Sequence, residues 1–241
     1  DEYVKLRMIG FTLWMTNRGI AYNSLLKFLR QQNLDVANLF FEMVSEQHYS
    51  PKAIQNIYEK YMESTINELY DSPEAILSKI QDDDEFQKLV DEKAGFNVIR
   101  YHHAIVLSEC MGEWTEYVLN IAYKLLQKNG KLDDEIKKQF HEIANYCRGK
   151  CHNPLGKDRM NTNPDFVFNY DINKWLDDVT NYSLDKFELK EPLKLKFTLT
   201  DEQFKIIEDN VELFGHTTVG YTRALKHVHE RIFWRNPILL K

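Results

Sequence analysis

Apolar residues at helical spacing fill the first 150 positions of this chain, and clear start signals divide them into separate helices. Ser50-Pro51 and Ser72-Pro73 are the clearest of these signals. Each pair places a hydroxyl acceptor at the N-cap and a proline at the first helical position, where the missing N–H removes no hydrogen bond. A sequence divided in this way is constrained to form a multi-helical domain.

Further capping residues mark the other helix ends. Asp133 is a suitable N-cap, and Asn129-Gly130 is a typical C-terminal stop. The first helix carries Leu6, Ile9 and Leu13, with further apolar residues on its other faces, as expected of a buried helix. The last helix of this part is expected to end near Gly149. The spacing predicts helices at about 3–16, 22–30, 35–44, 51–65, 73–80, 96–111, 114–128 and 134–148.

The character of the sequence changes at a stretch rich in Gly, Pro and Asn, residues 149–164. The two best strands follow, at 166–171 and 193–199, and the second alternates strictly between apolar and polar residues. Thr200-Asp201-Glu202-Gln203 then has the form of a capping box. These features predict a mainly α domain with a small two-stranded antiparallel element in its C-terminal part. We expect a helical subregion at 1–148 and an α+β subregion at 165–241, joined by the loop and packed as one unit.

Composition and charge exclude several classes of protein. With 43% hydrophobic residues the chain can form a packed core, and its formal net charge of −6 offers no general basic face for nucleic acid or anionic lipid. No apolar run is long enough for a transmembrane helix. Three cysteines are too few for a disulfide framework and suit a reducing compartment. We therefore expect a cytoplasmic protein without nucleic-acid or membrane partners.

The second half of the chain carries an order of residues found in a known family. That order is Phe168-x-Tyr170-Asp171-Ile172-x-x-Trp175-Leu176, an apolar strand, Thr200-x-x-Gln203-x-x-Ile206-Ile207, and Phe214-Gly215-x-Thr217 before an Arg-containing terminal helix. It resembles the region after the barrel in cobalamin-binding-domain radical S-adenosylmethionine (SAM) proteins, including those often labelled anaerobic magnesium-protoporphyrin IX monomethyl ester oxidative cyclases. Glu2-Tyr3-x-x-Leu6-Arg7 and Asn17-Arg18-Gly19 are similar to the helix and turn that leave the barrel there.

The resemblance implies a parent enzyme, an oxidoreductase or methyltransferase, that cleaves SAM with a [4Fe-4S] cluster and binds cobalamin in a separate N-terminal domain. The partners of this chain would be the cobalamin and radical SAM domains of the same parent. The chain itself has no CxxxCxxC motif and no Asp-x-His-x-x-Gly loop, and its first residue, Asp1, is not an initiator methionine. We therefore expect the cluster to lie upstream, and no catalytic or cofactor-binding residue to lie in this chain.

Two cysteines and a histidine are the candidate metal ligands. Cys147 and Cys151 lie at i and i+4, with His152 next to them, and thiolates with an imidazole suit zinc. The stretch has the first interval of CxxxCxxC, but Pro154 stands where the third cysteine would be. The alternative interpretation is a pair of ordinary, partly buried thiols near a helix end.

The expected final helix, at about 219–234, carries an excess of basic residues. Arg223, His227 and Arg231 are candidates for contact with an anionic substrate, a cofactor carboxylate or the missing domains. The alternative is a cationic helix end that the helix dipole favours.

Other residues with chemical potential have simpler structural interpretations. His102-His103 is expected to place one imidazole in the core and one in solvent, because adjacent helical residues diverge by about 100°. The four tryptophans could line a pocket for a planar ligand or fill the core. A dinuclear metal site lacks its diagnostic Glu-x-x-His spacing, so its possible ligands are assigned to solvated faces. Those residues are Glu109, Glu113, Glu116, His141 and Glu142.

Three functions remain as hypotheses. The first is an accessory, substrate-capping domain of a cobalamin-dependent radical SAM enzyme, which is not catalytic alone. The second is a stand-alone helical interaction or ligand-binding module that zinc could stabilise. The third is an independent hydrolase or metal-dependent enzyme, for which the sequence offers no nucleophile elbow, P-loop, HExxH motif or Gly-rich dinucleotide loop.

Overall fold

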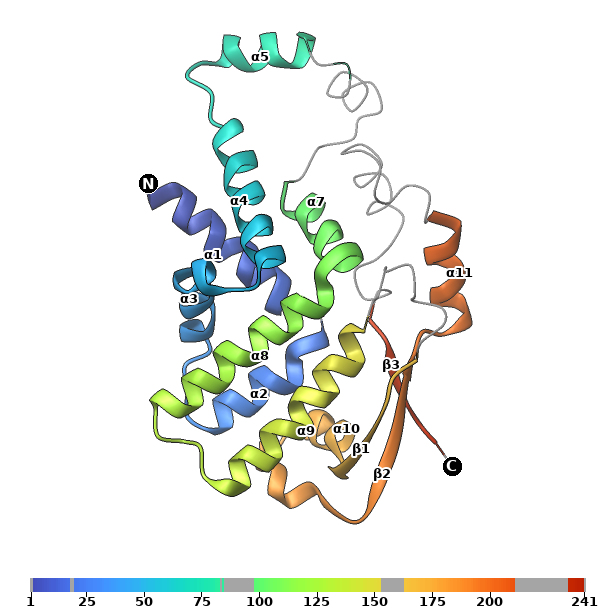
Figure 1. The fold of residues 1–241 in the computed structure, drawn as a ribbon. Helices are drawn as coiled ribbons and strands as arrows, with labels where there is room; N and C mark the ends of the chain where they lie inside the picture. Colours follow the sequence, from blue (N-terminus) through green and yellow to red (C-terminus); the bar gives the residue numbers. More distant parts are fainter. Residues whose placement is uncertain are drawn as a thin grey trace.

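The chain forms a helical bundle with a small sheet against one side, as seen in a computed structural model (Figure 1). The structure describes residues 2–17, 20–82, 84, 98–152, 163–210 and 234–240. Its helices are α1 (Glu2–Asn17), α2 (Asn23–Gln31), α3 (Ala37–Ser45), α4 (Lys52–Asn67), α5 (Pro73–Asp82), α7 (Val98–Ile105), α8 (Met111–Lys128), α9 (Asp134–Cys151), α10 (Ile172–Asp177) and α11 (Asp201–Asn210). Short 3-10 turns are η1 (Ile20–Tyr22), η2 (Gln47–Tyr49) and η4 (Leu184–Phe187). The mainly α fold expected from the sequence is confirmed.

Hydrogen bonds confirm the predicted helix signals. Asp133 Oδ1 accepts from Ile136 N at 2.8 Å where α9 begins. Ser72 Oγ accepts from Ala75 N at 3.2 Å where α5 begins. After α8, Gly130 has a φ of +64°, a left-handed conformation that glycine adopts without strain. Local chemistry therefore sets these boundaries.

The predicted capping box at Thr200 and Gln203 is formed, whereas Ser50-Pro51 does not cap its helix as predicted. Thr200 Oγ1 accepts from Gln203 N at 3.2 Å, and Gln203 Oε1 accepts from Thr200 N at 2.9 Å. Helix α4 begins at Lys52, so Ser50 is not its N-cap. The Ser50 hydroxyl instead donates to Gln47 O at 2.5 Å in the preceding turn.

Helices α7 and α8 are joined without the predicted break. A π-helical turn, η3 (Val106–Cys110), leads directly from one helix into the other. The extra residue in a π turn widens the helix and allows a change of direction. The prediction of separate helices at 96–111 and 114–128 is therefore wrong at their junction. The chain changes direction through the π-helical turn there and not through a break between two helices.

Helix α9 runs past its predicted end. It continues to Cys151 and includes Gly149, which was expected to stop it. A Cβ atom at position 149 would lie 2.5 Å from Cδ2 of Phe197, a residue of the sheet. Glycine at this position allows the Phe197 ring to lie against the helix. The residue therefore serves close packing, and the loop does not begin at 149.

Among the described residues the sheet has three antiparallel strands in the order β1-β2-β3, where two were predicted. The two expected segments form β1 (Asp165–Tyr170) and β2 (Glu188–Thr198). The third strand, β3 (Asn236–Leu239), pairs with the other edge of β2. This strand contains Pro237, which cannot donate a backbone hydrogen bond to a ladder. An edge strand tolerates that loss.

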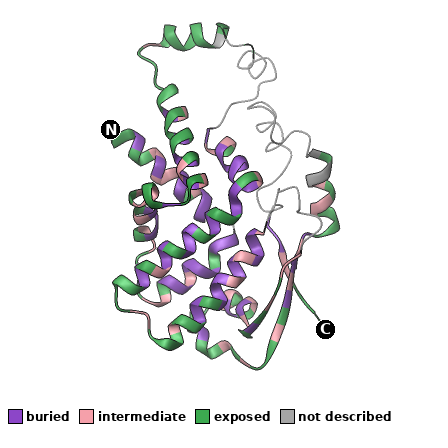
Figure 2. Ribbon diagram, in the orientation of Figure 1, coloured by how far each residue is buried: buried purple, intermediate pink, exposed green. Residues whose placement is uncertain are grey.

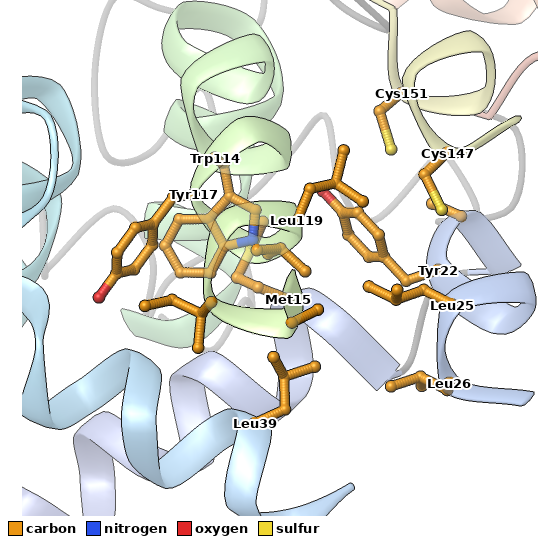
Figure 3. Close-up of a cluster of buried hydrophobic side chains, with 14 of the residues drawn as sticks. Met15, Tyr22, Leu25, Leu26, Leu39, Trp114, Tyr117, Leu119, Cys147 and Cys151 are labelled. Atoms are coloured by element: carbon orange, nitrogen blue, oxygen red, sulfur yellow. The ribbon is translucent and has the colours of Figure 1, made fainter. Parts of the chain in front are cut away.

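One hydrophobic core joins the helices to the sheet (Figure 2). Trp114 of α8 is fully buried in it (Figure 3). The Trp114 ring contacts the rings of Phe11 and Tyr58 at centroid distances of 5.7 and 5.8 Å. Tyr146 of α9 meets Phe197 of β2 edge-on at 5.4 Å. In the part of the chain that is described, no helix combines the length and apolar character needed to cross a membrane.

Helix α1 buries only one of its apolar faces. Leu6 and Leu13 are 67% and 40% exposed. Its buried apolar residues are Val4, Met8, Phe11 and Met15. The expectation of a helix buried all round is therefore wrong for α1, because α3 and α4 contact it and leave another face uncovered by described residues.

Candidate functional site

The two cysteines predicted as metal ligands lie in the core (Figure 3). Cys147 Sγ is 3.4 Å from Ser24 Oγ, and Cys151 lies beside the hydroxyl groups of Tyr22 and Thr115. Burial raises the pKa of Cys147 to about 11 and that of Cys151 to about 12. Both side chains are therefore thiols at neutral pH, whereas zinc binds thiolates.

His152 does not complete a metal site among the described residues. The His152 carbonyl accepts from Arg235 Nε at 2.7 Å. Within the described ranges, no three His, Cys, Asp or Glu side chains are grouped so that they could hold a metal. Arg223, His227 and Arg231 lie outside the residues that the structure describes. Arg235 is fully buried, and its guanidinium also donates to Asn163 Oδ1 at 2.5 Å.

Glu142 was assigned to a solvated face, but it is buried and holds β1 against α9. Its carboxylate accepts from Asn169 N at 2.9 and 3.0 Å, from Asn169 Nδ2 at 2.6 Å and from Tyr170 N at 3.2 Å. The register of β1 shifts between Phe168 and Tyr170, so this carboxylate satisfies amides at an irregularity of the strand. Glu142 therefore has a structural role.

The other acids considered for a metal site lie in different settings. Glu116 accepts two hydrogen bonds from Arg148, at 2.6 and 2.8 Å. His141 is exposed, and its Nε2 lies 3.2 Å from Asn145 Nδ2. Glu109 and Glu113 lie near the thiol of Cys110.

Both histidines of the His102-His103 pair are buried, so the expectation of one solvated imidazole is wrong. His102 Nε2 is 3.1 Å from Ser64 Oγ, and Trp14 Nε1 donates to His103 Nδ1 at 3.2 Å. Helix α7 contacts α4 as well as α1, which explains the burial of two diverging side chains. Burial lowers the pKa of His102 to about 4.

The strongest candidate for a binding site is a polar cleft of about 1150 Å³ lined by residues of α2, α9 and α10. Helix α2 contacts both of the other helices (Figure 1). Pockets of this order accommodate small molecules. One face of α2 contributes polar side chains at helical spacing, and α9 and α10 contribute the others. The side chains of interest are Asn23, Lys27 and Arg30 from α2, Tyr146 and Lys150 from α9, and Asn173 from α10.

Lys27 is anchored by groups at the end of α10. Its Nζ donates to Trp175 O and, at 3.1 Å, to Asp178 O. The same Nζ lies 4.8 Å from the centroid of a Trp175 ring. A cation at the C-terminal end of a helix is favoured by the unpaired carbonyls there. The position of Lys27 is thus explained by its own contacts.

Lys150 lies in the same cleft, but no hydrogen bond to a described residue anchors its amine. It is 7% exposed, and no described group forms a hydrogen bond or an ion pair with its Nζ. Its Nζ is 5.9 Å from the centroid of the Tyr146 ring. Burial lowers the pKa of Lys150. A buried amine facing a polar cleft is an arrangement found at functional sites.

Sequence reasoning did not find this cleft. Lys150 falls in a stretch that was predicted to be a loop, and its partners in the cleft come from helices distant in the sequence. The polar residues Asn23, Lys27 and Arg30 at i, i+4 and i+7 were the one available signal, but such a stripe is also typical of a solvated helix face.

A second hollow is apolar and lies between α1, α3 and α4, with a volume of about 590 Å³. Its apolar lining is Val4, Met8, Ile9, Phe41, Val44, Met62 and Ile66. Phe41 and Ile66 are 51% and 48% exposed, and the exposed Leu6 lies on the same helix as Val4. We call this surface the apolar groove.

Scans against protein-family models, curated proteins and solved structures find no match to this chain.

Proposed function

We propose that this chain is an accessory, substrate-capping domain of a cobalamin-dependent radical SAM enzyme and is not catalytic alone. The parent reaction would be of the oxidative cyclase or methyltransferase type. The [4Fe-4S] cluster, SAM and cobalamin would be held by the N-terminal cobalamin and radical SAM domains. The sequence resemblance described above supports the choice of family.

The apolar groove is the observation that supports an accessory role. Large exposed apolar surfaces on folded proteins commonly mark sites of interaction. Helix α1 carries apolar residues on several faces, yet Leu6 and Leu13 are not covered by described residues. Because α1 resembles the helix that leaves the radical SAM barrel, we propose that the barrel covers the groove beside it.

Docking of this kind would serve radical chemistry. A domain that closes over an active site excludes water and limits side reactions of reactive intermediates. The cysteines Cys110, Cys147 and Cys151 are all free and buried, which is compatible with the reducing cytoplasm that we propose as the compartment.

The isolated chain provides the first test. We expect it to bind neither SAM nor cobalamin and to show no iron–sulfur absorbance after anaerobic reconstitution. Formation of a stoichiometric cluster would contradict the proposal. The complete reading frame around Asp1 is expected to encode CxxxCxxC and Asp-x-His-x-x-Gly upstream, and a frame without them would remove the family assignment.

The groove can be tested with the proposed upstream domains added as a separate polypeptide. Phe41→Asp is expected to weaken their association with this chain by about tenfold or more, since it places a charge in an apolar interface. Val179→Asp is the matched control, because Val179 is 91% exposed and does not line the groove. Equal association of the two variants would exclude the groove as the docking surface.

The second candidate function is a stand-alone ligand-binding module, which the polar cleft favours. The zinc-stabilised form of this hypothesis is tested by elemental analysis and by melting with and without a chelator. Stoichiometric zinc and a lower melting temperature in the chelator would support it.

A further inference from the structure

We propose that the polar cleft binds a small molecule through its carboxylate or phosphate group, with Lys150 Nζ as the charged contact. This site is separate from the apolar groove, and binding there requires no other domain. The inference therefore goes beyond the accessory role and can be tested on this chain alone.

The Lys150 amine is buried without a hydrogen-bond or ion-pair partner among the described residues. Buried charges in proteins are normally paired, because removal of an ion from water is strongly unfavourable. Lys150 is more than nine-tenths buried, and no described acid pairs with it. The thiols of Cys147 and Cys151 are the titratable groups that act on the pKa of Lys150, and burial keeps both thiols protonated and neutral at physiological pH. An anion entering the cleft would supply the missing partner.

The acids that line the cleft do not fill that place. Asp178 accepts hydrogen bonds from Thr180 N at 3.0 Å and Tyr182 N at 2.8 Å, so its carboxylate orders the following loop. Asp177 is exposed. Neither carboxylate forms a hydrogen bond or an ion pair with Lys150 Nζ. The positive charge of Lys150 is therefore left for a ligand.

A fixed amide stands near the lysine. The Tyr146 hydroxyl donates to Asn173 Oδ1 at 2.7 Å, and the Tyr146 ring lies next to Lys150 Nζ. Because the oxygen of this amide is engaged, its Nδ2 group is left to donate. No described residue accepts from Asn173 Nδ2. Tyr146 thus joins a cation and an amide donor in one lining, as recognition of an anionic oxygen group requires.

The size and polarity of the cleft define the rest of the ligand. A space of about 1150 Å³ is much larger than a single ion needs. Arg30 adds a further positive charge on the α2 face, and Asn23 adds another amide. These groups favour a polar organic molecule with an anionic end over an apolar one.

The test uses the 241-residue chain and two probes, inorganic phosphate and malonate, in calorimetric titrations at constant ionic strength. At least one probe is expected to bind, and Lys150→Met is expected to weaken its binding by about tenfold or more. Lys138→Met is the matched control, since Lys138 is an exposed lysine on the same helix that does not line the cleft. The affinity of Lys138→Met for the same probe is expected to stay within about twofold of the wild-type affinity.

The two probes also separate the two anion classes. Binding of phosphate alone supports a phosphate ester as ligand, and binding of malonate alone supports a carboxylate. Binding of both supports the shared site. Absence of binding by both probes overturns the proposal, as does equal binding by wild type and Lys150→Met.

Two measurements protect the test against a folding artefact. Lys150→Met is expected to melt at the wild-type temperature or above, because it removes an unpaired buried charge. In the wild-type protein, the bound probe is expected to slow acetylation of Lys150 relative to Lys138, as read by mass spectrometry of the peptides. Equal slowing at both lysines overturns the proposal even where the variant does not fold.

Discussion

Gly149→Ala tests the contact between α9 and the sheet. The new Cβ would lie 2.5 Å from Phe197 Cδ2 and 2.6 Å from Cγ and Cε2. Carbon atoms pack at separations of about 3.5–4.0 Å, so the ring would have to move by about 1 Å. Phe197 is fully buried and is bordered by the rings of Tyr146, Phe166 and Phe168. The ring therefore has little space in which to move.

The expected change is a net loss of stability. Overpacking of a core costs about 1–3 kcal/mol, whereas replacing glycine by alanine inside a helix contributes about 1 kcal/mol of stabilisation. The free energy of unfolding should therefore fall by up to about 2 kcal/mol. Gly10→Ala in α1 is the control, because nothing lies within 4 Å of its Cβ position, and it should raise stability by about 0.5–1 kcal/mol.

Urea denaturation followed by circular dichroism measures both variants. A Gly149→Ala variant that is as stable as Gly10→Ala would show that the Phe197 ring does not lie against α9. Adding Phe197→Leu to Gly149→Ala creates a double-mutant cycle, which should return a favourable coupling if the smaller side chain relieves the clash. Independent effects of the two substitutions would refute the proposed contact.

Three further predictions follow from buried polar groups. Glu142→Ala should lower the free energy of unfolding by about 3 kcal/mol, since it leaves amides of β1 unpaired, whereas the exposed Glu113→Ala should change it by less than about 0.5 kcal/mol in urea denaturation. Burial lowers the pKa of His102 to about 4. Below about pH 6.5 the His102 imidazole therefore takes up a proton in the unfolded chain, whereas it stays neutral in the folded protein until the pH approaches about 4. Wild-type stability should then fall by roughly 2–3 kcal/mol more than that of His102→Gln between pH 7 and pH 4.5, and parallel pH profiles would contradict this. Burial also lowers the pKa of Lys150, so its charge disfavours folding below the folded-state pKa, and this effect fades as the pH rises toward 10.5. The difference in free energy of unfolding between Lys150→Met and the wild-type protein should therefore be smaller at pH 10 than at pH 7, as measured by urea denaturation at both pH values.

The helices were predictable where their signals are local. The Asp133 cap, the Gly130 stop and the Thr200 capping box each depend on hydrogen bonds or backbone conformation within a few residues. The same holds for the two main strands, which follow alternation of residues along the chain. Gly149 shows the limit of such signals, because its role depends on Phe197, a residue of a distant strand.

The candidate site was not predictable in the same way. The sequence indicated Cys147 and Cys151 by their spacing, but the fold surrounds both with core residues and keeps them as thiols. Lys150, one residue before Cys151, gave no signal of its own. Its significance arises only because α2 and α10 meet α9 around it and provide no acid that pairs with it.

The sequence by itself determined that this chain is mainly helical, where most helices begin, and which segments form the first two strands. These properties depend on caps, turns and periodicity, whose interactions span a few residues. Only the tertiary structure decided that Leu6 and Leu13 of α1 are exposed, that Glu142 is buried against β1 and that Lys150 faces the cleft. Burial and partners depend on which elements meet across long distances in the chain, and no local pattern records that choice.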